Sequence, residues 1–122
     1  MSGEGNDIGK GIITDRRPWG NFKRYTYNQQ CTVKIITVDP NQMVSKQAHS
    51  KRDELWVILD ERLTVELDDK VIHPKAGDEI IIPRGAKHRL CAHGPKGRVL
   101  EISFGFFDED DVERFDDLYG RQ

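Results

Sequence analysis

The chain has 122 residues, a length that fits one compact domain with a single core. Its 19 Lys and Arg residues against 21 Asp and Glu residues give a formal net charge of −2, without a block of basic residues, so we expect no nucleic-acid partner. Apolar residues make up 36% of the chain in short runs, well below the about 18 consecutive apolar residues typical of a membrane span, so we expect no membrane partner.

The N-terminal stretch MSGEGNDIGKG is polar and rich in glycine. It lacks the apolar region of a secretory signal and the Arg-rich pattern of a transit peptide, so we expect a cytoplasmic protein. Residues 1–10 are predicted to be disordered and residues 11–122 to form the domain. Cys31 and Cys91 have no CxxC spacing and no third partner, which favours buried free thiols over a disulfide.

Short stretches with alternating apolar residues, separated by Gly, Pro and Asp turns, follow one another along the chain. They predict an all-β fold, a closed or double-sheet antiparallel barrel of the jelly-roll type with a mouth that can hold a small ligand. The predicted strands are Asn21–Tyr27, Cys31–Val38, Met43–His49, Leu55–Leu59, Leu63–Leu67, Val71–His73, Glu79–Ile82, His88–Ala92 and Arg98–Phe106.

The last segment, FDEDDVERFDDLYGRQ, has a helical pattern instead. Asp108 is a candidate N-cap, the acidic residues after it suit the positive end of a helix, and Gly120 is a stop signal. We therefore predict a short C-terminal helix that packs on the outside of the barrel through Val112, Phe115 and Leu118.

Three polar side chains converge in the stretch QAHSKRDE. Gln47 and His49 are two residues apart, so on a strand their side chains lie on the same face. Glu54 follows after a four-residue turn, and an antiparallel pairing would bring it back alongside His49. The three residues are candidate metal ligands that need a fourth.

The stretch GDEIIIPRGAKHRL supplies the fourth candidate, His88. Gly85 permits a tight bend just before the strand that His88 begins. Two imidazoles, a carboxylate and an amide oxygen suit one divalent ion of Zn, Mn, Fe, Co or Ni, with open positions for water or substrate. For Gln47, a simple hydrogen-bonding role in the cavity is the alternative.

These two motifs resemble those of the cupin superfamily, with Gln47 where many cupins have a first histidine. The stretches RPWGNF, QAHSKRDELWVIL, IPRGAKHRL and EDDVERFDDLYGR are in addition similar to the cupin domain of type II phosphomannose isomerases, a domain often joined to a mannose-1-phosphate guanylyltransferase. Lys51 and Leu55 depart from that pattern, since histidine is common at both positions. Without a glycine-rich nucleotidyltransferase segment, the resemblance implies isomerase chemistry rather than guanylyl transfer.

The resemblance implies a metal-dependent enzyme that interconverts mannose 6-phosphate and fructose 6-phosphate, with a sugar phosphate as its small-molecule partner. Arg52 matches an arginine of the family motif and is the candidate for holding the phosphate or stabilising an enediolate. Glu101, if it points into the barrel, is a candidate base with a raised pKa. Lys34, a cation among apolar neighbours, is a candidate second cation. We expect a homodimer, because small barrels have open sheet edges.

Other interpretations remain open. Arg52 could pair with Asp53 on the surface, and Lys34 could be a solvated lysine on the outside of its strand. The alternatives for the function are a metal-dependent dioxygenase, a non-catalytic sugar-binding or sensor cupin, and a metal-free structural barrel.

Overall fold

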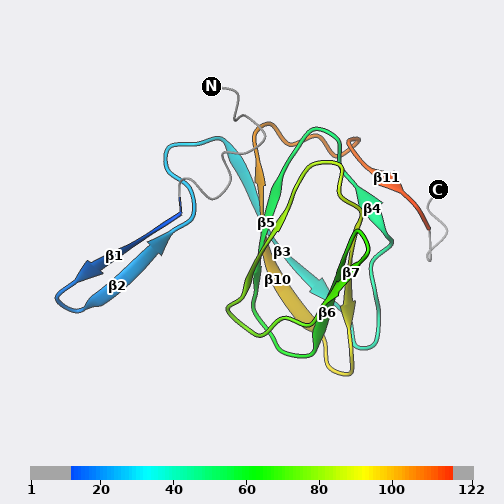
Figure 1. Ribbon diagram of the computed structural model, residues 1–122, viewed down its shortest axis with the longest axis horizontal. Helices are drawn as coiled ribbons and strands as arrows, with labels where there is room; N and C mark the ends of the chain where they lie inside the picture. Colours follow the sequence, from blue (N-terminus) through cyan, green and yellow to red (C-terminus); the bar gives the residue numbers. More distant parts are fainter. Residues whose placement is uncertain (1–11, 117–122) are drawn as a thin grey trace.

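The computed structural model describes residues 12–116, which form two facing antiparallel sheets and a separate two-stranded hairpin (Figure 1). The hairpin pairs β1 with β2, one sheet has the strand order β3-β10-β5-β8, and the other has the order β11-β4-β9-β6-β7. The strands are β1 Ile13–Arg17, β2 Gly20–Arg24, β3 Cys31–Val38, β4 Gln47–Ala48, β5 Glu54–Ile58, β6 Leu63–Leu67, β7 Lys70–Ile72, β8 Glu79–Ile82, β9 His88–Ala92, β10 Gly97–Phe104 and β11 Glu113–Arg114. The predicted all-β jelly roll is confirmed.

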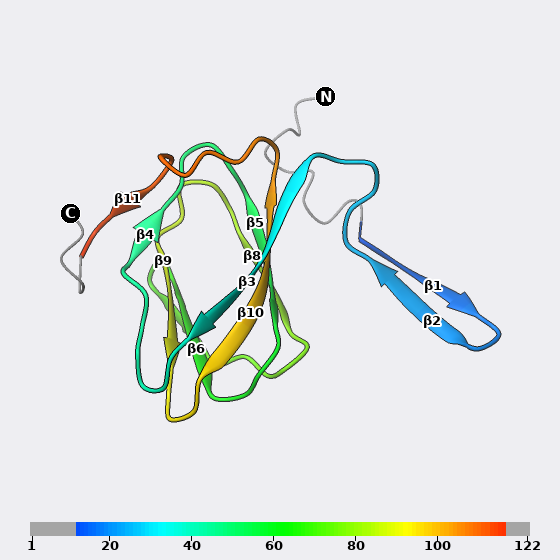
Figure 2. The same ribbon diagram turned by 180° about the vertical axis from the view of Figure 1, so that it is seen from behind.

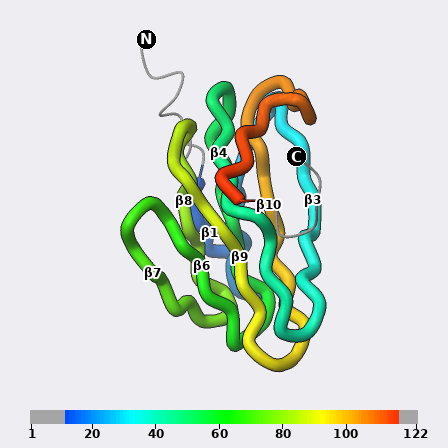
Figure 3. Tube along the Cα trace, turned by 90° about the vertical axis from the view of Figure 1, so that its right-hand side faces the viewer, coloured from blue at the N-terminus to red at the C-terminus, as the bar shows by residue number. Residues whose placement is uncertain are grey.

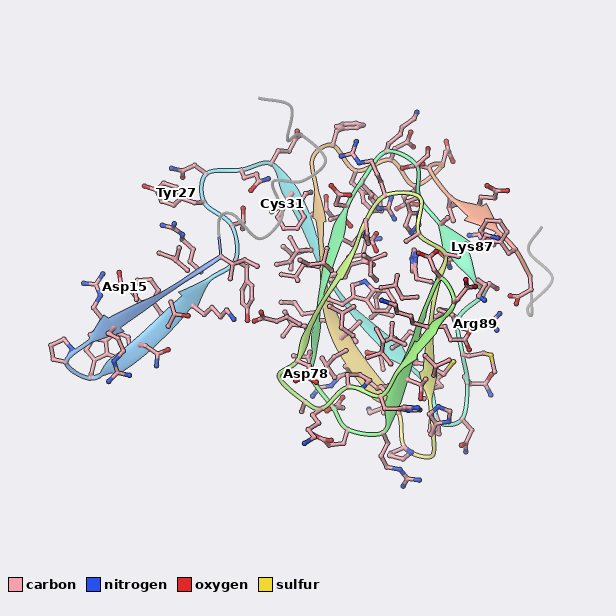
Figure 4. All side chains as sticks on the ribbon, viewed as in Figure 1. Asp15, Tyr27, Cys31, Asp78, Lys87 and Arg89 are labelled. Atoms are coloured by element: carbon pink, nitrogen blue, oxygen red, sulfur yellow. The ribbon has the colours of Figure 1, made fainter. Side chains whose placement is uncertain are left out.

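The main core lies between the two sheets, and side chains fill this space (Figure 4). Strand β5 is buried on both faces, with Trp56 and Ile58 in the main core and Leu55 and Val57 in a second cluster on the outer face of its sheet. The main core consists of Val38, Trp56, Ile58, Leu63, Val65, Ile80, Ile82, Ala86, Leu90, Ala92 and Val99. Because β5 begins with Glu54, the most buried strand of the fold places a carboxylate inside the barrel.

The β1–β2 hairpin extends away from the barrel, as the two opposite views show (Figures 1 and 2). Its base is tied to the barrel through Glu79 on β8. Tyr25 Oη donates a hydrogen bond to Glu79 Oε2 at 2.8 Å, and Lys23 Nζ donates one to Glu79 Oε1 at 2.9 Å. These polar contacts hold the base of the hairpin, and Tyr25 also packs against the outer-face cluster that contains Leu55 and Val57.

The outer face of the β3-β10-β5-β8 sheet also carries exposed apolar residues. Val33 and Ile35 on β3 and Ile81 on β8 are each more than two-fifths exposed. Exposed apolar surface is frequent where proteins associate. The homodimer nevertheless stays a prediction, as does the cytoplasmic location.

The chain after β10 crosses one end of the barrel and then descends beside β4 (Figures 1 and 3). The helix predicted to begin at Asp108 is wrong within the described residues, because β11 pairs with β4 through Glu113↔Ala48 and Arg114↔Gln47. Phe115 N also donates to Lys46 O at 2.8 Å, so the backbone groups of this segment serve β4 rather than a helix. The predicted end of that helix, Leu118 and Gly120, lies outside the described residues.

Both cysteines are free, as predicted; Cys91 is buried and Cys31 is half-buried. Among residues 12–116 there is no helix of the length and apolar character needed to cross a lipid bilayer. The predicted disorder of residues 1–10 falls on residues that the structure does not describe.

Candidate metal centre

The turn between β4 and β5 is held in place by two acidic side chains. Asp111 accepts hydrogen bonds from Ser50 N and Lys51 N, both at 2.9 Å, and Asp53 Oδ1 accepts one from Arg84 N at 2.7 Å. These contacts fix the backbone between the two ends of the turn. The turn therefore delivers His49 and Glu54 to the same end of the barrel, as the sequence predicted.

A second turn, which carries Gly85, lies directly against the first. Gly85 has φ +84°, a left-handed conformation that favours glycine, and its N–H donates to His49 O at 2.7 Å. His88 begins β9 immediately afterwards and is the register partner of Gln47 on β4. Two turns 35 residues apart in the sequence thus bring the two motifs together in space.

His49, Glu54 and His88 form a buried cluster in which one ligand atom from each residue lies within 4.8 Å of the others. Glu54 is fully buried, and His49 and His88 are 6% and 3% exposed. His49 Nε2 lies 3.6 Å from Glu54 Oε2, and His88 Nε2 lies 4.0 Å from Glu54 Oε1. The structure therefore brings the three predicted ligands that are histidines or carboxylates to one point.

Backbone carbonyls orient both imidazole rings. His49 Nδ1–H donates to Asp111 O at 2.7 Å, and His88 Nδ1–H donates to Ala86 O at 3.0 Å. In this tautomer each Nε2 has its lone pair on the side of Glu54, and the lone pair of His49 accepts a hydrogen bond from Arg52. Burial lowers the pKa of His49, and it lowers the pKa of His88 to about 4, so both rings are unprotonated at neutral pH.

The residues present fit a divalent metal ion. Glu54 Oε1 is buried and has no hydrogen-bond partner within the part of the chain that is described. A buried carboxylate oxygen without a donor is unfavourable, and a cation bound beside the two imidazole lone pairs would satisfy it. Two histidines and one carboxylate are a common set for divalent transition metals.

Gln47 lines the same cavity as His49 and His88. Gln47 is on β4, where it is the register partner of His88 on β9 on one side and of Arg114 on β11 on the other. Its role as a metal ligand stays a prediction.

Arg52 is buried and hydrogen-bonded to two members of the cluster. Its Nε donates to Glu54 Oε2 at 2.7 Å, and its Nη2 donates to His49 Nε2 at 3.2 Å. The surface pair with Asp53 is not formed, since Asp53 pairs with Arg84 instead. Arg52 is therefore directed into the barrel, where it already holds the anionic ligand residue.

Glu101 and Lys34 face each other across β10 and β3 as register partners. Glu101 is 5% exposed, and its Oε2 accepts a hydrogen bond from Trp56 Nε1 at 3.1 Å. Burial, together with the charge of nearby Glu54, raises the pKa of Glu101 to about 7. Both predicted residues thus belong to the same interior face, with Glu101 deep and Lys34 close to the surface.

The cluster opens into a cavity of about 150 Å³. Its lining includes Lys34, Gln47, Trp56 and Glu101 besides the two histidines and Arg52. A second hollow of about 230 Å³ shares Lys34, Gln47, His49 and Arg52 with the first and lies toward the surface. The two together form a path from the surface to the cluster.

Three residues of the site were missed by the sequence analysis: Phe107, Asp111 and Arg114. All three lie in the segment for which a helix on the outside of the barrel was predicted. Phe107 and Arg114 border the path, and the Asp111 carbonyl orients His49. The only signal for them was that the family resemblance continues to Arg121.

Comparisons with known proteins agree with this architecture. A family model described as "Mannose-6-phosphate isomerase C-terminal" matches residues 7–117. Among solved structures, KdgF from Halomonas sp. superposes with a TM-score of 0.62 at 16% identity, covering 86% of this chain and 88% of that one. A cupin-2 domain protein from Shewanella frigidimarina superposes with a TM-score of 0.55 at 21% identity, covering 66% and 74%. These structures support the cupin fold alone.

The curated relatives are much longer proteins. The mannose-1-phosphate guanylyltransferase of Salmonella montevideo is 34% identical over 109 residues, which cover 86% of this chain and 23% of that protein. The alginate biosynthesis protein AlgA of Pseudomonas aeruginosa is 35% identical over 107 residues, which cover 86% and 22%. This chain therefore spans less than a quarter of the length of these relatives.

These relatives correct the predicted function. The assignment of mannose 6-phosphate and fructose 6-phosphate interconversion is wrong for this chain, because the matching proteins are named for guanylyl transfer and for alginate or xanthan biosynthesis. The resemblance was to a domain that is often joined to a guanylyltransferase, and the names of the relatives do not support the isomerase activity that was inferred for that domain.

Proposed function

The chain belongs to the mannose-6-phosphate isomerase C-terminal family, and on that basis we propose that it is a metal-binding cupin that takes up a mannose phosphate in its barrel. One relative, from Salmonella montevideo, is named a mannose-1-phosphate guanylyltransferase. The proposal concerns binding of one divalent metal ion and one sugar phosphate.

The buried cluster of His49, Glu54 and His88 carries this proposal. Both rings are fixed in the tautomer that turns Nε2 toward the carboxylate, and one oxygen of that carboxylate has no donor among residues 12–116. A structural cluster without a metal would be expected to satisfy that oxygen with a hydrogen bond. Two oriented imidazole rings and an available carboxylate oxygen are the features that a metal site needs in its metal-free form.

Zn, Mn, Fe, Co or Ni would each be held by these three residues, with Gln47 as a further candidate. When bound, such an ion supplies a Lewis acid that attracts the hydroxyl or carbonyl oxygens of a sugar. The ligand set does not by itself choose among these metals.

The residues around the cluster suit a polar, anionic ligand. Glu101, with a pKa of about 7, is present in both protonation states at neutral pH and can donate a hydrogen bond to a sugar hydroxyl or accept one from it. Arg52 and Lys34 add positive charge along the path. A neutral sugar has no negative charge to pair with Arg52 and Lys34, so a phosphorylated sugar suits the path better.

Calorimetric titration of the metal-reconstituted chain with mannose 1-phosphate and mannose 6-phosphate tests the proposal. We expect saturable binding of one of these ligands that requires the metal and is lost in His88→Ala. The matched control is His73→Ala, because His73 is an exposed histidine outside the cavity. Binding that is equally strong after metal removal, or no binding by a metal-loaded wild type, would overturn the proposed ligand.

A further inference from the structure

The outer part of the path, the hollow of about 230 Å³, is lined by more cations than carboxylates. Three cations line it, namely Lys34, Arg52 and Arg114, and Glu109 is the only carboxylate among its lining residues in the described chain. Arg52 is already paired with Glu54 deeper in the barrel. Lys34 and Arg114 therefore remain as two cations at the mouth.

Lys34 is held at this mouth by its strand and by an aromatic ring. Its register partner is Glu101, so its side chain leaves β3 on the interior face. Its Nζ lies 4.1 Å from the centre of the Phe107 ring, a cation–π contact. Across residues 12–116 no carboxylate forms an ion pair with Lys34, so its charge is available to a ligand.

Arg114 is brought to the same hollow by β11. Its register partner is Gln47, which stands between Arg114 and His88 on adjacent strands. Arg114 Nε is buried and has no hydrogen-bond partner in the described residues. A buried guanidinium N–H without an acceptor is unfavourable, so this group would gain from an acceptor that residues 12–116 do not provide.

We propose that Lys34 and Arg114 form a phosphate subsite at the mouth of the barrel. The proposal rests on the proposed function and adds the orientation of the ligand, with the phosphate group outward and the hydroxyl-bearing carbons toward His49, Glu54 and His88. A phosphate monoester has a charge of about −1.5 to −2 at neutral pH and three acceptor oxygens. An arginine fork and an ammonium group match these oxygens better than they match a single hydroxyl.

The test compares ligands with and without the phosphate group on the metal-loaded chain. The ligands are mannose 6-phosphate, mannose 1-phosphate, unphosphorylated mannose and inorganic phosphate. We expect Arg114→Met and Lys34→Met each to weaken binding of the mannose phosphate about 10-fold to 100-fold, the range for a lost hydrogen bond to a charged group. Binding of mannose and the metal content are expected to be unchanged, and Arg114→Lys should retain part of the affinity.

Arg98→Met is the matched control, because Arg98 is an exposed arginine that pairs with Asp60 away from the path. Thermal melting of each variant shows whether it is folded. If the wild type binds a mannose phosphate and both variants bind it equally well, the subsite is wrong and the proposed function stands. If the metal-loaded wild type binds mannose phosphates no better than mannose, the proposed ligand fails and the subsite fails with it.

Competition by inorganic phosphate shows whether Arg114 binds the phosphate group directly or only supports β4. Inorganic phosphate that competes with the sugar phosphate in the wild type, and competes less in Arg114→Met, would support a site that reads the phosphate group itself. Equal loss of mannose and mannose phosphate binding in Arg114→Met would contradict the subsite, because it would show that Arg114 supports β4 rather than the phosphate.

Discussion

Arg52 and Glu54 form a buried ion pair at the centre of the candidate metal site, with Arg52 Nε 2.7 Å from Glu54 Oε2. A second nitrogen of the same guanidinium donates to His49 Nε2 at 3.2 Å. His49 Nε2, which would bind a metal ion, and the second oxygen of the Glu54 carboxylate are thus hydrogen-bonded to a side-chain cation. Metal binding and the Arg52 contacts are therefore in competition.

Replacing Arg52 tests this competition. In Arg52→Met the buried Glu54 carboxylate loses its partner, so the free energy of unfolding of the metal-free chain should fall by about 3–5 kcal/mol. Metal affinity should rise about tenfold or more, because no hydrogen bonds to charged groups have to be broken. Chelator-competition titrations and melting curves with and without metal measure both effects.

Arg84→Met is the control for this experiment, since it removes an arginine that pairs with Asp53 on the outside of the same turn. It should leave metal affinity unchanged. Weaker metal binding in Arg52→Met than in the wild type would show that Arg52 supports the site instead of competing for it.

Asp111 connects the C-terminal segment to the His49 turn. Its carboxylate accepts three hydrogen bonds, from Ser50 N, Ser50 Oγ and Lys51 N, each at 2.9 Å. Burial raises the pKa of Asp111, but the bonds from Ser50 and Lys51 outweigh this and hold the pKa below its usual value. Asp111→Ala should therefore destabilise the fold by about 1–3 kcal/mol and weaken metal binding through a loosened His49.

The neighbouring Asp110→Ala serves as the comparison, because Asp110 is exposed and its carboxylate lies outside these contacts. Urea denaturation and metal titration of the two variants measure the difference. Identical behaviour of both variants would show that the turn holds its shape without Asp111.

The Lys23–Glu79–Tyr25 contact should make the stability depend on pH in the acid range. The hydrogen bond from Lys23 is the main reason that the pKa of Glu79 lies below its unfolded value, and the bond from Tyr25 adds to it. A lowered pKa stabilises the fold above the unfolded pKa of 4.5, and this contribution is lost as the pH falls through the folded pKa. Because the group is partly exposed, we expect less than about 1 kcal/mol.

Melting curves of the wild type and Glu79→Gln between about pH 6 and pH 3 measure this contribution. The stability difference between the two proteins should shrink as the pH falls. A difference that stays constant over this range would mean that Glu79 is not held in its charged form by the hairpin.

Gly97 begins β10 at a point where the chain has no room for a side chain. A Cβ at this position would overlap Leu63 Cδ2 in the core. Gly97→Ala should destabilise the fold by about 1–3 kcal/mol through overpacking. The double variant Gly97→Ala with Leu63→Ala should lose less unfolding free energy than the sum of the losses in the two single variants. Equal values in denaturant titrations would contradict the contact.

The sequence located the barrel strands well because their apolar residues alternate. The predicted bounds of Cys31–Val38, Leu63–Leu67, Glu79–Ile82 and His88–Ala92 are those of β3, β6, β8 and β9. The missed strands lack this signal. Strand β1, with the sequence ITDRR, is almost entirely polar and exposed, and β11 has only two residues, too few to show a period.

The site was predictable where its residues lie in the two motifs. The convergence of His49, Glu54 and His88 followed from strand parity and two turns, and it is found in the structure. The direction of Arg52 was not predictable, because a charged residue in a turn is usually solvated and only the fold shows that Glu54 lies buried beneath it. Arg114 was hidden for a different reason: its acidic neighbours favoured a helix, and only the pairing of β11 with β4 places it at the mouth.

The metal content of the purified chain tests the central claim most directly. After incubation with Zn, Mn, Fe, Co or Ni and extensive dialysis, elemental analysis should find one metal ion per chain in the wild type and in His73→Ala. His88→Ala and Glu54→Gln should retain much less than one, while melting curves show that they remain folded. A wild type that retains none of these metals, or a Glu54→Gln variant that retains one ion per chain, would contradict the claim that His49, Glu54 and His88 form a metal site.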